Sequence, residues 1–350
     1  MTQAPNHLNT PEEIDEPLLY EHHRVVADKG QSLLRVDKFL LAHLQNTSRN
    51  RIQKAAEAGF IHVNDRPVKS NYRVKPCDVV CVMLNYERYD TTIEPEDIPL
   101  DIAFEDDDII VVNKPAGMVV HPGCGNYTST LVNAIAWHLK DNKTFNANDP
   151  EVGLVHRIDK DTSGLLVIAK TPQAKTKLGL QFFNKTTSRL YNALVWGDFD
   201  TNQGTIIGNI ARDPRDRLRM AVFDPNSGIG KHAVTHWRVL RRYRYVTLIE
   251  CRLETGRTHQ IRAHMKHIGH PLFADARYGG DQILRGTTQN TYTQFVKRCL
   301  ATCPRQALHA KTLGFVHPST QQQINLNSQW PTDFKQLIDL WENYTTTNLK

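Results

Sequence analysis

The sequence predicts an α+β protein of two domains, because helical and strand-like segments alternate along a chain long enough to bury two cores. Of its 350 residues, 40% are hydrophobic and 23% are charged, a balance that is typical of globular proteins. Three segments carry the prediction. Residues 164–169 form an apolar run typical of a strand buried on both faces, residues 188–197 alternate like a strand, and residues 36–44 have helical spacing.

The chain begins with residues 1 to about 20, which are polar and which we expect to be disordered. A first domain is predicted at residues 33–84. It opens with the helix at 36–44 and continues with a second helix, capped by Thr47 or Ser48 and stopped by Gly59. Strands are expected at 60–63 and 79–82, with a tight turn after the first of them.

The start of this domain carries a basic face. Its residues are Arg35, Arg49, Arg51 and Lys54. Two of them lie close to the positive end of the second helix, where an anion would be favoured. Composition alone, however, favours ordinary solvated side chains here.

An acidic linker with two prolines, residues 85–100, leads to a second domain predicted at 101–342. Its expected elements are strands at 109–112, 164–169 and 188–197, helices at 130–139 and 171–183, a hairpin-like region at 204–235, and a helix that Thr258 caps and Gly269 ends. In that last helix Ile261, Met265 and Ile268 form the buried stripe, and Arg262 lies at its edge.

The most unusual segment comes directly before the central strand. Residues 156–161 place five ionisable groups in six positions where a polar loop meets the core. The spacing of these residues is as consistent with a solvated turn as with a functional site. It also does not indicate whether Asp159 or Asp161 would be the reactive carboxylate.

Residues 156–170, HRIDKDTSGLLVIAK, closely resemble the signature of the RluA-type pseudouridine synthases. Four further segments resemble the same family in the same order: NKPAG at 113–117, RLYNALV at 189–195, TGRTHQIRAH at 255–264 and RQALHA at 305–310. The family usually has a lysine at the position of Arg189, and this substitution keeps the charge. The resemblance covers about residues 33–320 and includes the first domain, which is similar to the S4 RNA-binding domain.

The resemblance implies a catalytic domain built on a mixed, mainly antiparallel sheet with flanking helices. It implies that Asp159 is the nucleophile, attacking either C1′ of the sugar or C6 of the base, and that Arg262 pairs with it. Tyr191 would stack on the extruded base, and Arg157 would fill the space left behind or hold the displaced backbone. In the S4-like domain Arg35, Arg49, Arg51 and Lys54 would contact phosphates.

The function implied is that of a cofactor-independent, monomeric isomerase that converts uridine to pseudouridine in RNA. Length and the S4-like domain are most similar to the D branch, which acts on 23S ribosomal RNA or its large-subunit precursor. Alternatives are the C type, acting on other 23S uridines, and a non-catalytic RNA-binding factor of ribosome assembly. A glycosidase with paired carboxylates at Asp159 and Asp161 is disfavoured by the basic surroundings.

The sequence gives little support for other classes of protein, such as membrane proteins, metalloproteins or nucleotide-binding enzymes. No segment has the apolar length of a membrane span, and we expect a cytoplasmic protein whose six cysteines are reduced. Cys299 and Cys303 lack a second pair, and the histidines at 259, 264, 267 and 270 lack the spacing of a metal motif, so no metal is expected. Neither a Walker loop nor a dinucleotide fingerprint is present, and the net charge of +6 permits a polyanionic partner without requiring one.

Overall fold

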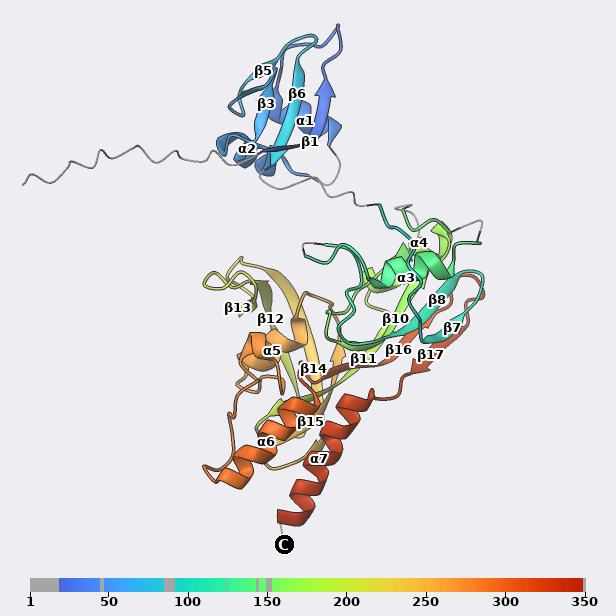
Figure 1. Ribbon diagram of the computed structural model, residues 1–350, viewed down its shortest axis with the longest axis vertical. Helices are drawn as coiled ribbons and strands as arrows, with labels where there is room; N and C mark the ends of the chain where they lie inside the picture. Colours follow the sequence, from blue (N-terminus) through green and yellow to red (C-terminus); the bar gives the residue numbers. More distant parts are fainter. Residues whose placement is uncertain are drawn as a thin grey trace, which may run out of the picture. The chain divides into compact units, whose positions relative to one another are not determined.

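Figure 1 shows the computed structural model, which describes residues 19–44, 47–84, 92–123, 125–142, 145–148 and 153–348. The chain divides into two units, residues 1–90 and 91–350. Residues 1–18, most of the segment expected to be disordered, lie outside the described residues, as does the 85–91 part of the predicted linker.

The first unit is a small sheet packed on two helices. The sheet has the order β1 (Tyr20–Val26), β6 (Val79–Leu84), β3 (Ile61–Val63) and β4 (Arg66–Pro67), and β2 (Leu34–Arg35) pairs separately with β5 (Arg73–Val74). Helices α1 (Val36–His43) and α2 (Arg49–Glu57) pack into the same core. The Ser48 hydroxyl caps α2 by accepting a hydrogen bond from the Arg51 amide.

Strands β1, β2, β4 and β5 of this unit were not predicted from the sequence, and β1 is the longest of them. Strand β1, YEHHRVV, lies at the edge of the sheet and pairs with β6. It is mostly polar and no residue in it is fully buried. Because only one side of an edge strand is paired and its faces are solvated, it lacks the apolar alternation that marks a strand in a sequence.

The second unit is built on one mixed sheet of eleven strands. Nine of them follow the order β13-β12-β14-β15-β11-β16-β10-β8-β7, while β17 pairs with β16 and β9 with β10. All pairs are antiparallel except β10 with β16. The bounds are β7 Ile102–Glu105, β8 Ile109–Lys114, β9 Gly153–Leu154, β10 Ser163–Ala169, β11 Ser188–Trp196, β12 Gln203–Arg212, β13 Met220–Phe223, β14 Lys231–Arg242, β15 Val246–Leu253, β16 Leu308–Val316 and β17 Gln323–Asn327. The α+β prediction with a mainly antiparallel sheet is confirmed.

Helices cover both faces of this sheet. They are α3 (Leu131–His138), α4 (Pro172–Phe183), α5 (Gln260–His267), the short 3₁₀ turn η1 (Ala276–Tyr278), α6 (Asn290–Thr302) and α7 (Thr332–Asn348). Helices α3 and α5 pack on one core and α4 on another. Strand β10 contributes alternate side chains to these two cores, Leu166 and Ile168 to the first and Leu165 and Val167 to the second. It is therefore buried on both faces, as predicted.

Two details differ from the sequence analysis or add to it. Helix α5 begins after His259, which is in the left-handed region with φ of 53°, and no side chain caps it, so Thr258 is not the cap. The polar insert at 281–304 contains α6, whose Tyr292 and Val296 share a core with Phe334 and Trp341 of α7. Within the described part of the chain no helix is both long and apolar enough to cross a membrane.

The parallel pairing of β10 with β16 brings two backbones unusually close at Gly164. This glycine has φ of +115°, and a Cβ added to it would lie 2.2 Å from the Ala310 carbonyl oxygen. Only glycine tolerates both the backbone angle and the approach. The glycine that follows Thr162 and Ser163 thus sets the position where the preceding loop meets β16.

We expect Gly164→Ala to lower the free energy of unfolding by at least about 3 kcal/mol, through backbone strain and overpacking together. Gly179→Ala is the matched control, because Gly179 lies in α4 with nothing within 4 Å of an added Cβ and without a positive φ. That change should stabilise the protein by about 0.5–1 kcal/mol. Urea unfolding of both variants measures the difference, and equal stability would show that the close approach is not a constraint.

Candidate active site

The predicted nucleophile lies in a tight turn between β9 and β10. The Thr162 amide donates to the Asp159 carbonyl over 3.1 Å, which closes the turn. The carbonyl of Lys160, at the tip, accepts a hydrogen bond from the Gly117 amide over 3.0 Å. The backbone of the turn is therefore held by the 113–117 segment, and the Asp159 side chain is left to face outward from it.

A buried lysine supports the turn from below. The Nζ atom of Lys114 donates to the carbonyls of Pro115, Met118 and Lys160 at 2.7–2.8 Å. Burial lowers the pKa of Lys114 to about 7. Its three donors are all used by backbone oxygens, so we assign Lys114 to holding the turn and not to chemistry.

A buried arginine supports the turn from the β16 side. Arg305 forms two hydrogen bonds with Asp333 of α7, at 2.7 and 3.0 Å, and its Nη1 donates to the Asp161 carbonyl over 3.0 Å. Sequence reasoning placed Arg305 in a closing strand and did not assign it this contact.

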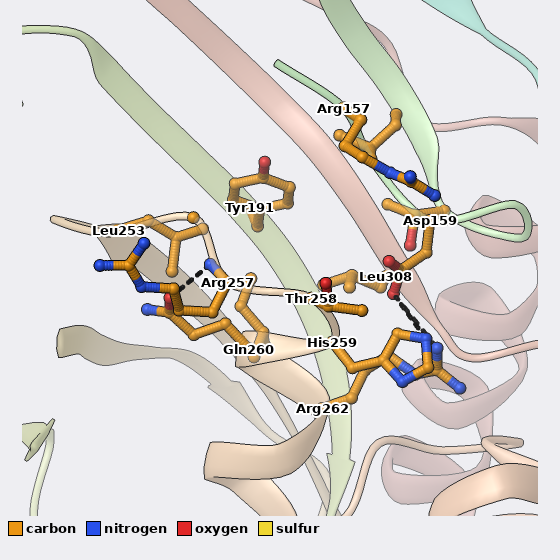
Figure 2. A pocket seen from close by; sticks show the side chains of 14 residues that line it. Arg157, Asp159, Tyr191, Leu253, Arg257, Thr258, His259, Gln260, Arg262 and Leu308 are labelled. Carbon is orange, nitrogen blue, oxygen red and sulfur yellow. Dashed lines mark hydrogen bonds and ion pairs between the residues drawn. The ribbon is translucent and has the colours of Figure 1, made fainter. Parts of the chain in front are cut away.

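The side chain of Asp159 meets Arg262 of α5. Nη1 of Arg262 donates to Oδ2 of Asp159 over 3.1 Å (Figure 2). Nε and Nη2 of the same guanidinium donate to the two oxygens of Asp275, at 2.7 and 2.9 Å. Burial by itself would lower the pKa of Arg262, but the hydrogen bonds and charge of Asp275, with Asp159, raise it, so the guanidinium stays protonated.

Asp275 is a site residue that the sequence analysis missed. It is 1% exposed and precedes η1, and it also accepts a hydrogen bond from the Tyr278 amide. A signal was present, because Asp275 is a lone acid in the apolar and aromatic segment PLFADARY. A buried acid in such a segment requires a cationic or hydrogen-bonding partner, although the sequence does not say which.

A pocket of about 110 Å³ opens beside Asp159, and Arg157, Tyr191 and Arg262 also line it. Leu253 and Leu308 supply apolar wall, and Figure 2 shows Asp159 and Arg262 facing each other at one side of the pocket. The four sequence-predicted residues of the catalytic domain are thus brought together. The pocket is partly apolar and partly charged, as suits a flat, polar heterocycle.

Tyr191 extends from β11 and is 7% exposed. Burial raises the pKa of its phenol, and the carboxylate of Asp159 raises it further, so Tyr191 is neutral. Arg189, two residues earlier, is also buried, and its guanidinium lies over the Phe182 ring at 5.4 Å. Gly256 makes room for it, since a Cβ there would lie 2.9 Å from Nη1 of Arg189.

A second, polar cavity of about 580 Å³ meets the site on the other side of Arg262. One wall is the loop of residues 213–219 between β12 and β13, which we call the hairpin loop. Two of its flanking arginines fold back on the loop: Arg212 donates to the Arg217 carbonyl, and Arg219 pairs with Asp216. Arg215 and Arg217 are exposed.

The predicted basic residues of the first unit differ in their surroundings. Arg35 and Arg49 both donate to the buried carboxylate of Asp37, at 3.0–3.1 Å. These bonds hold the pKa of Asp37 at about 2 against the effect of burial, so it stays ionised. Arg51 and Lys54 are exposed on α2.

The histidines considered as metal ligands do not converge. His264 bonds the Thr235 hydroxyl and His270 the Trp196 carbonyl. In the described ranges, the group with ligand-like geometry is Asp106, Asp108 and His317. Asp106 accepts hydrogen bonds there from two backbone amides and from His317, as a turn between strands requires.

Comparison with known proteins gives two family matches. Residues 108–267 match the family described as RNA pseudouridylate synthase, and residues 34–80 match the S4 domain. A protein of Chlorobaculum parvum named as an uncharacterized RNA pseudouridine synthase is 43% identical over 313 residues, which are 89% of this chain and 95% of that protein. Ribosomal large subunit pseudouridine synthase D of Neisseria meningitidis serogroup B is 41% identical over 308 residues, 87% of this chain and 78% of that protein.

The fold also has a counterpart among solved structures. Human RNA pseudouridylate synthase domain containing 4 aligns with a TM-score of 0.54 and 21% identity, covering 69% of this chain and 92% of that one. At this level of identity the likeness concerns the fold alone.

We expect Asp275→Asn to lower the free energy of unfolding by about 3–5 kcal/mol, because it removes the carboxylate charge that compensates the buried Arg262 guanidinium. Glu250→Gln is the control: its partner Arg238 is 60% exposed, and the loss should stay below about 1 kcal/mol. Denaturant titration compares the two. If Asp275→Asn is no more harmful than Glu250→Gln, the buried pair does not hold the site.

Proposed function

The chain belongs to the RNA pseudouridine synthase family and is therefore an isomerase that converts uridine to pseudouridine in RNA; we propose that its substrate is 23S RNA of the large ribosomal subunit. The proposal draws on the relatives of about 40% identity that are named large subunit pseudouridine synthase D, and on the S4 domain. Such a substrate implies an enzyme of the cytoplasm. We also propose that the enzyme acts as a monomer.

The observation that carries the catalytic part of the proposal is the hydrogen bond between Asp159 and Arg262, with Arg262 itself held by Asp275. A carboxylate nucleophile must be ionised where water is scarce, and burial opposes ionisation. The Arg262 guanidinium gives the Asp159 carboxylate a charge-assisted hydrogen bond. Asp159 is the nucleophile in this proposal: its carboxylate forms a bond to C1′ of the sugar or to C6 of the base, and the N1–C1′ bond breaks. The base then rotates and C5 bonds to C1′. The bond to Asp159 breaks, C5 loses its proton and N1 gains one.

Access of the target to Asp159 requires that the uridine leave its stack. Extrusion of a base has an unfavourable free energy of a few kcal/mol, which contacts in the pocket must offset. Tyr191 offers a neutral aromatic ring in the pocket, and stacking on an aromatic ring contributes about 1–3 kcal/mol per base. Arg157 is exposed at the pocket, where its guanidinium can take the place of the base in the stack or hold the displaced phosphate.

The S4 domain supplies affinity for RNA in this proposal. Arg51 and Lys54 are exposed on α2, so their charges can reach phosphates directly. Arg35 and Arg49 share the Asp37 carboxylate, so part of their hydrogen-bonding capacity is used inside the domain. We therefore assign the larger electrostatic contribution to Arg51 and Lys54.

We expect Asp159→Asn to abolish tritium release from RNA labelled at C5 of uridine, whereas Asp161→Asn, two residues along the same turn, retains release. The amide keeps the shape of residue 159 but cannot act as a nucleophile. In cells that lack the protein, the wild type and Asp161→Asn should restore the missing pseudouridines of 23S RNA, and Asp159→Asn should not.

Chemical mapping of pseudouridine in the ribosomal RNA of these strains reads the outcome. Release by Asp159→Asn at the wild-type rate would remove Asp159 from the mechanism. No release by the wild-type protein on any large-subunit RNA would contradict the proposed substrate and favour a binding factor.

For the S4 domain we expect Arg51→Ala and Lys54→Ala each to weaken RNA binding without unfolding the protein, and to lower the slope of log K against log salt by about one. Arg35→Ala should instead lower the free energy of unfolding, because it removes a partner from buried Asp37. Filter binding over a range of salt, alongside thermal unfolding, separates the two effects. An unchanged salt slope in the α2 variants would show that these residues do not meet phosphates.

A further inference from the structure

We infer that Tyr278 and His259 form a positioning chain that connects the hairpin loop to the nucleophile. The inference rests on the proposed function, because it takes Asp159 to be the attacking group. It adds two residues that the proposed mechanism does not use and gives each of them a task. Figure 2 shows His259 beside Arg262, on the same side of the pocket as Asp159.

The chain starts where the hairpin loop ends. The amide of Met220, the first residue of β13, donates to the hydroxyl oxygen of Tyr278 over 2.9 Å. The neighbouring Arg277 donates from Nη1 to the carbonyl of Leu218 over 2.7 Å. The loop is thus attached to η1 at two adjacent positions, and η1 follows directly on Asp275, which holds Arg262.

The middle of the chain has a defined direction of hydrogen bonding. The Tyr278 oxygen already accepts from Met220, and Nδ1 of His259 lies 3.1 Å from it. The phenol proton is then best placed to be donated to Nδ1, which leaves the proton of the neutral imidazole on Nε2. Burial lowers the pKa of His259, although the charge of Asp159 opposes this, so the ring is neutral.

The chain ends at the carboxylate. Nε2 of His259 lies 4.0 Å from Oδ2 of Asp159, the same oxygen that Arg262 contacts. In the part of the chain that the structure describes, no partner is found for Oδ1. Arg262 therefore donates a hydrogen bond to Oδ2, while Nε2 of His259 faces the same oxygen from beyond hydrogen-bond distance. We assign the attack to Oδ1, the other oxygen.

The backbone at His259 departs from the helix that follows it. Its φ of 53° and ψ of 25° lie in the left-handed region, which few residues other than glycine adopt and in which histidine is one of the enriched types. Residues held in this region gather at functional sites.

If this chain of contacts positions Asp159, the rate of the reaction depends on how RNA binds to the hairpin loop. Arg215 and Arg217 expose cationic side chains there, and a phosphate backbone is the ligand that their chemistry fits. A shift of the loop moves Met220 and with it the Tyr278 hydroxyl, so the hydrogen bond that orients His259 changes. Turnover would then be fast only when RNA lies correctly against the loop.

Tyr278→Phe tests the chain, with kcat and KM measured by tritium release from a labelled transcript of 23S RNA. We expect kcat to fall roughly tenfold, because a hydrogen bond to a charged-group network is lost, with KM unchanged. Tyr292→Phe is the matched control: Tyr292 is equally buried, its hydroxyl donates to the Arg285 carbonyl, and it lies in a separate core. That variant should keep the wild-type kcat.

His259→Asn and His259→Gln complete the test. Asparagine tolerates the left-handed backbone but does not reach Asp159, whereas glutamine carries an N–H at about the position of Nε2 and should recover part of kcat. The double variant of Tyr278→Phe with His259→Asn should be no slower than the slower single variant, since both changes interrupt the same series of contacts.

Three results would overturn the inference. In the first, the effects of Tyr278→Phe and His259→Asn on kcat multiply in the double variant. In the second, Tyr278→Phe raises KM and leaves kcat unchanged, and in the third it keeps the wild-type kcat, as Tyr292→Phe should. Each requires an active wild-type enzyme, so these outcomes differ from failure of the proposed function, in which the wild type itself releases no tritium. Thermal unfolding of every variant identifies any change that acts through stability alone. If a His259 variant does not fold, the comparison of the two tyrosine variants decides.

Discussion

The site depends on one guanidinium placed between two carboxylates. Arg262 uses two N–H groups on buried Asp275 and a third on Asp159. The Asp275 pair fixes the plane of the guanidinium, so the third N–H has a defined direction. The pair also compensates the charge of Arg262, which would otherwise be costly to bury. The result is a carboxyl group at the edge of an apolar core, held in one orientation before substrate arrives.

A second buried arginine repeats this arrangement on the opposite side of the turn. Arg305 is held by Asp333 and donates to the Asp161 carbonyl, as Arg262 is held by Asp275 and donates to the Asp159 side chain. One arginine thus fixes the main chain and the other the side chain. With Lys114, which donates to the Lys160 carbonyl, contacts from three distant segments hold the turn. Rigid support of this kind keeps a reacting group in its productive geometry.

The sequence contained the local features of this structure and few of the long-range ones. Strand β10 could be predicted because its apolar run is continuous, and α5 because its buried stripe has helical spacing. The grouping of Asp159, Tyr191 and Arg262 followed from a family resemblance and not from spacing. The pairing of Asp275 with Arg262 and of Asp333 with Arg305 could not be predicted, because a buried ion pair leaves no periodic pattern in the sequence. A lone acid in an apolar segment marks Asp275 as unusual, but it does not identify the partner. Strand β1 was missed because an edge strand with solvated faces resembles a polar loop.

The Arg305 contact also imposes an order on assembly during protein synthesis. Arg305 follows Asp161 by 144 residues, and Asp333 comes 28 residues later, in α7. A growing polypeptide emerges N-terminal part first, so the segment that carries Asp159 and Asp161 leaves the ribosome well before Arg305 and Asp333. A nascent or prematurely terminated chain without α7 would carry the whole signature and still lack Asp333, the residue that holds Arg305. The turn therefore gains the last of its supports only after α7 has been translated.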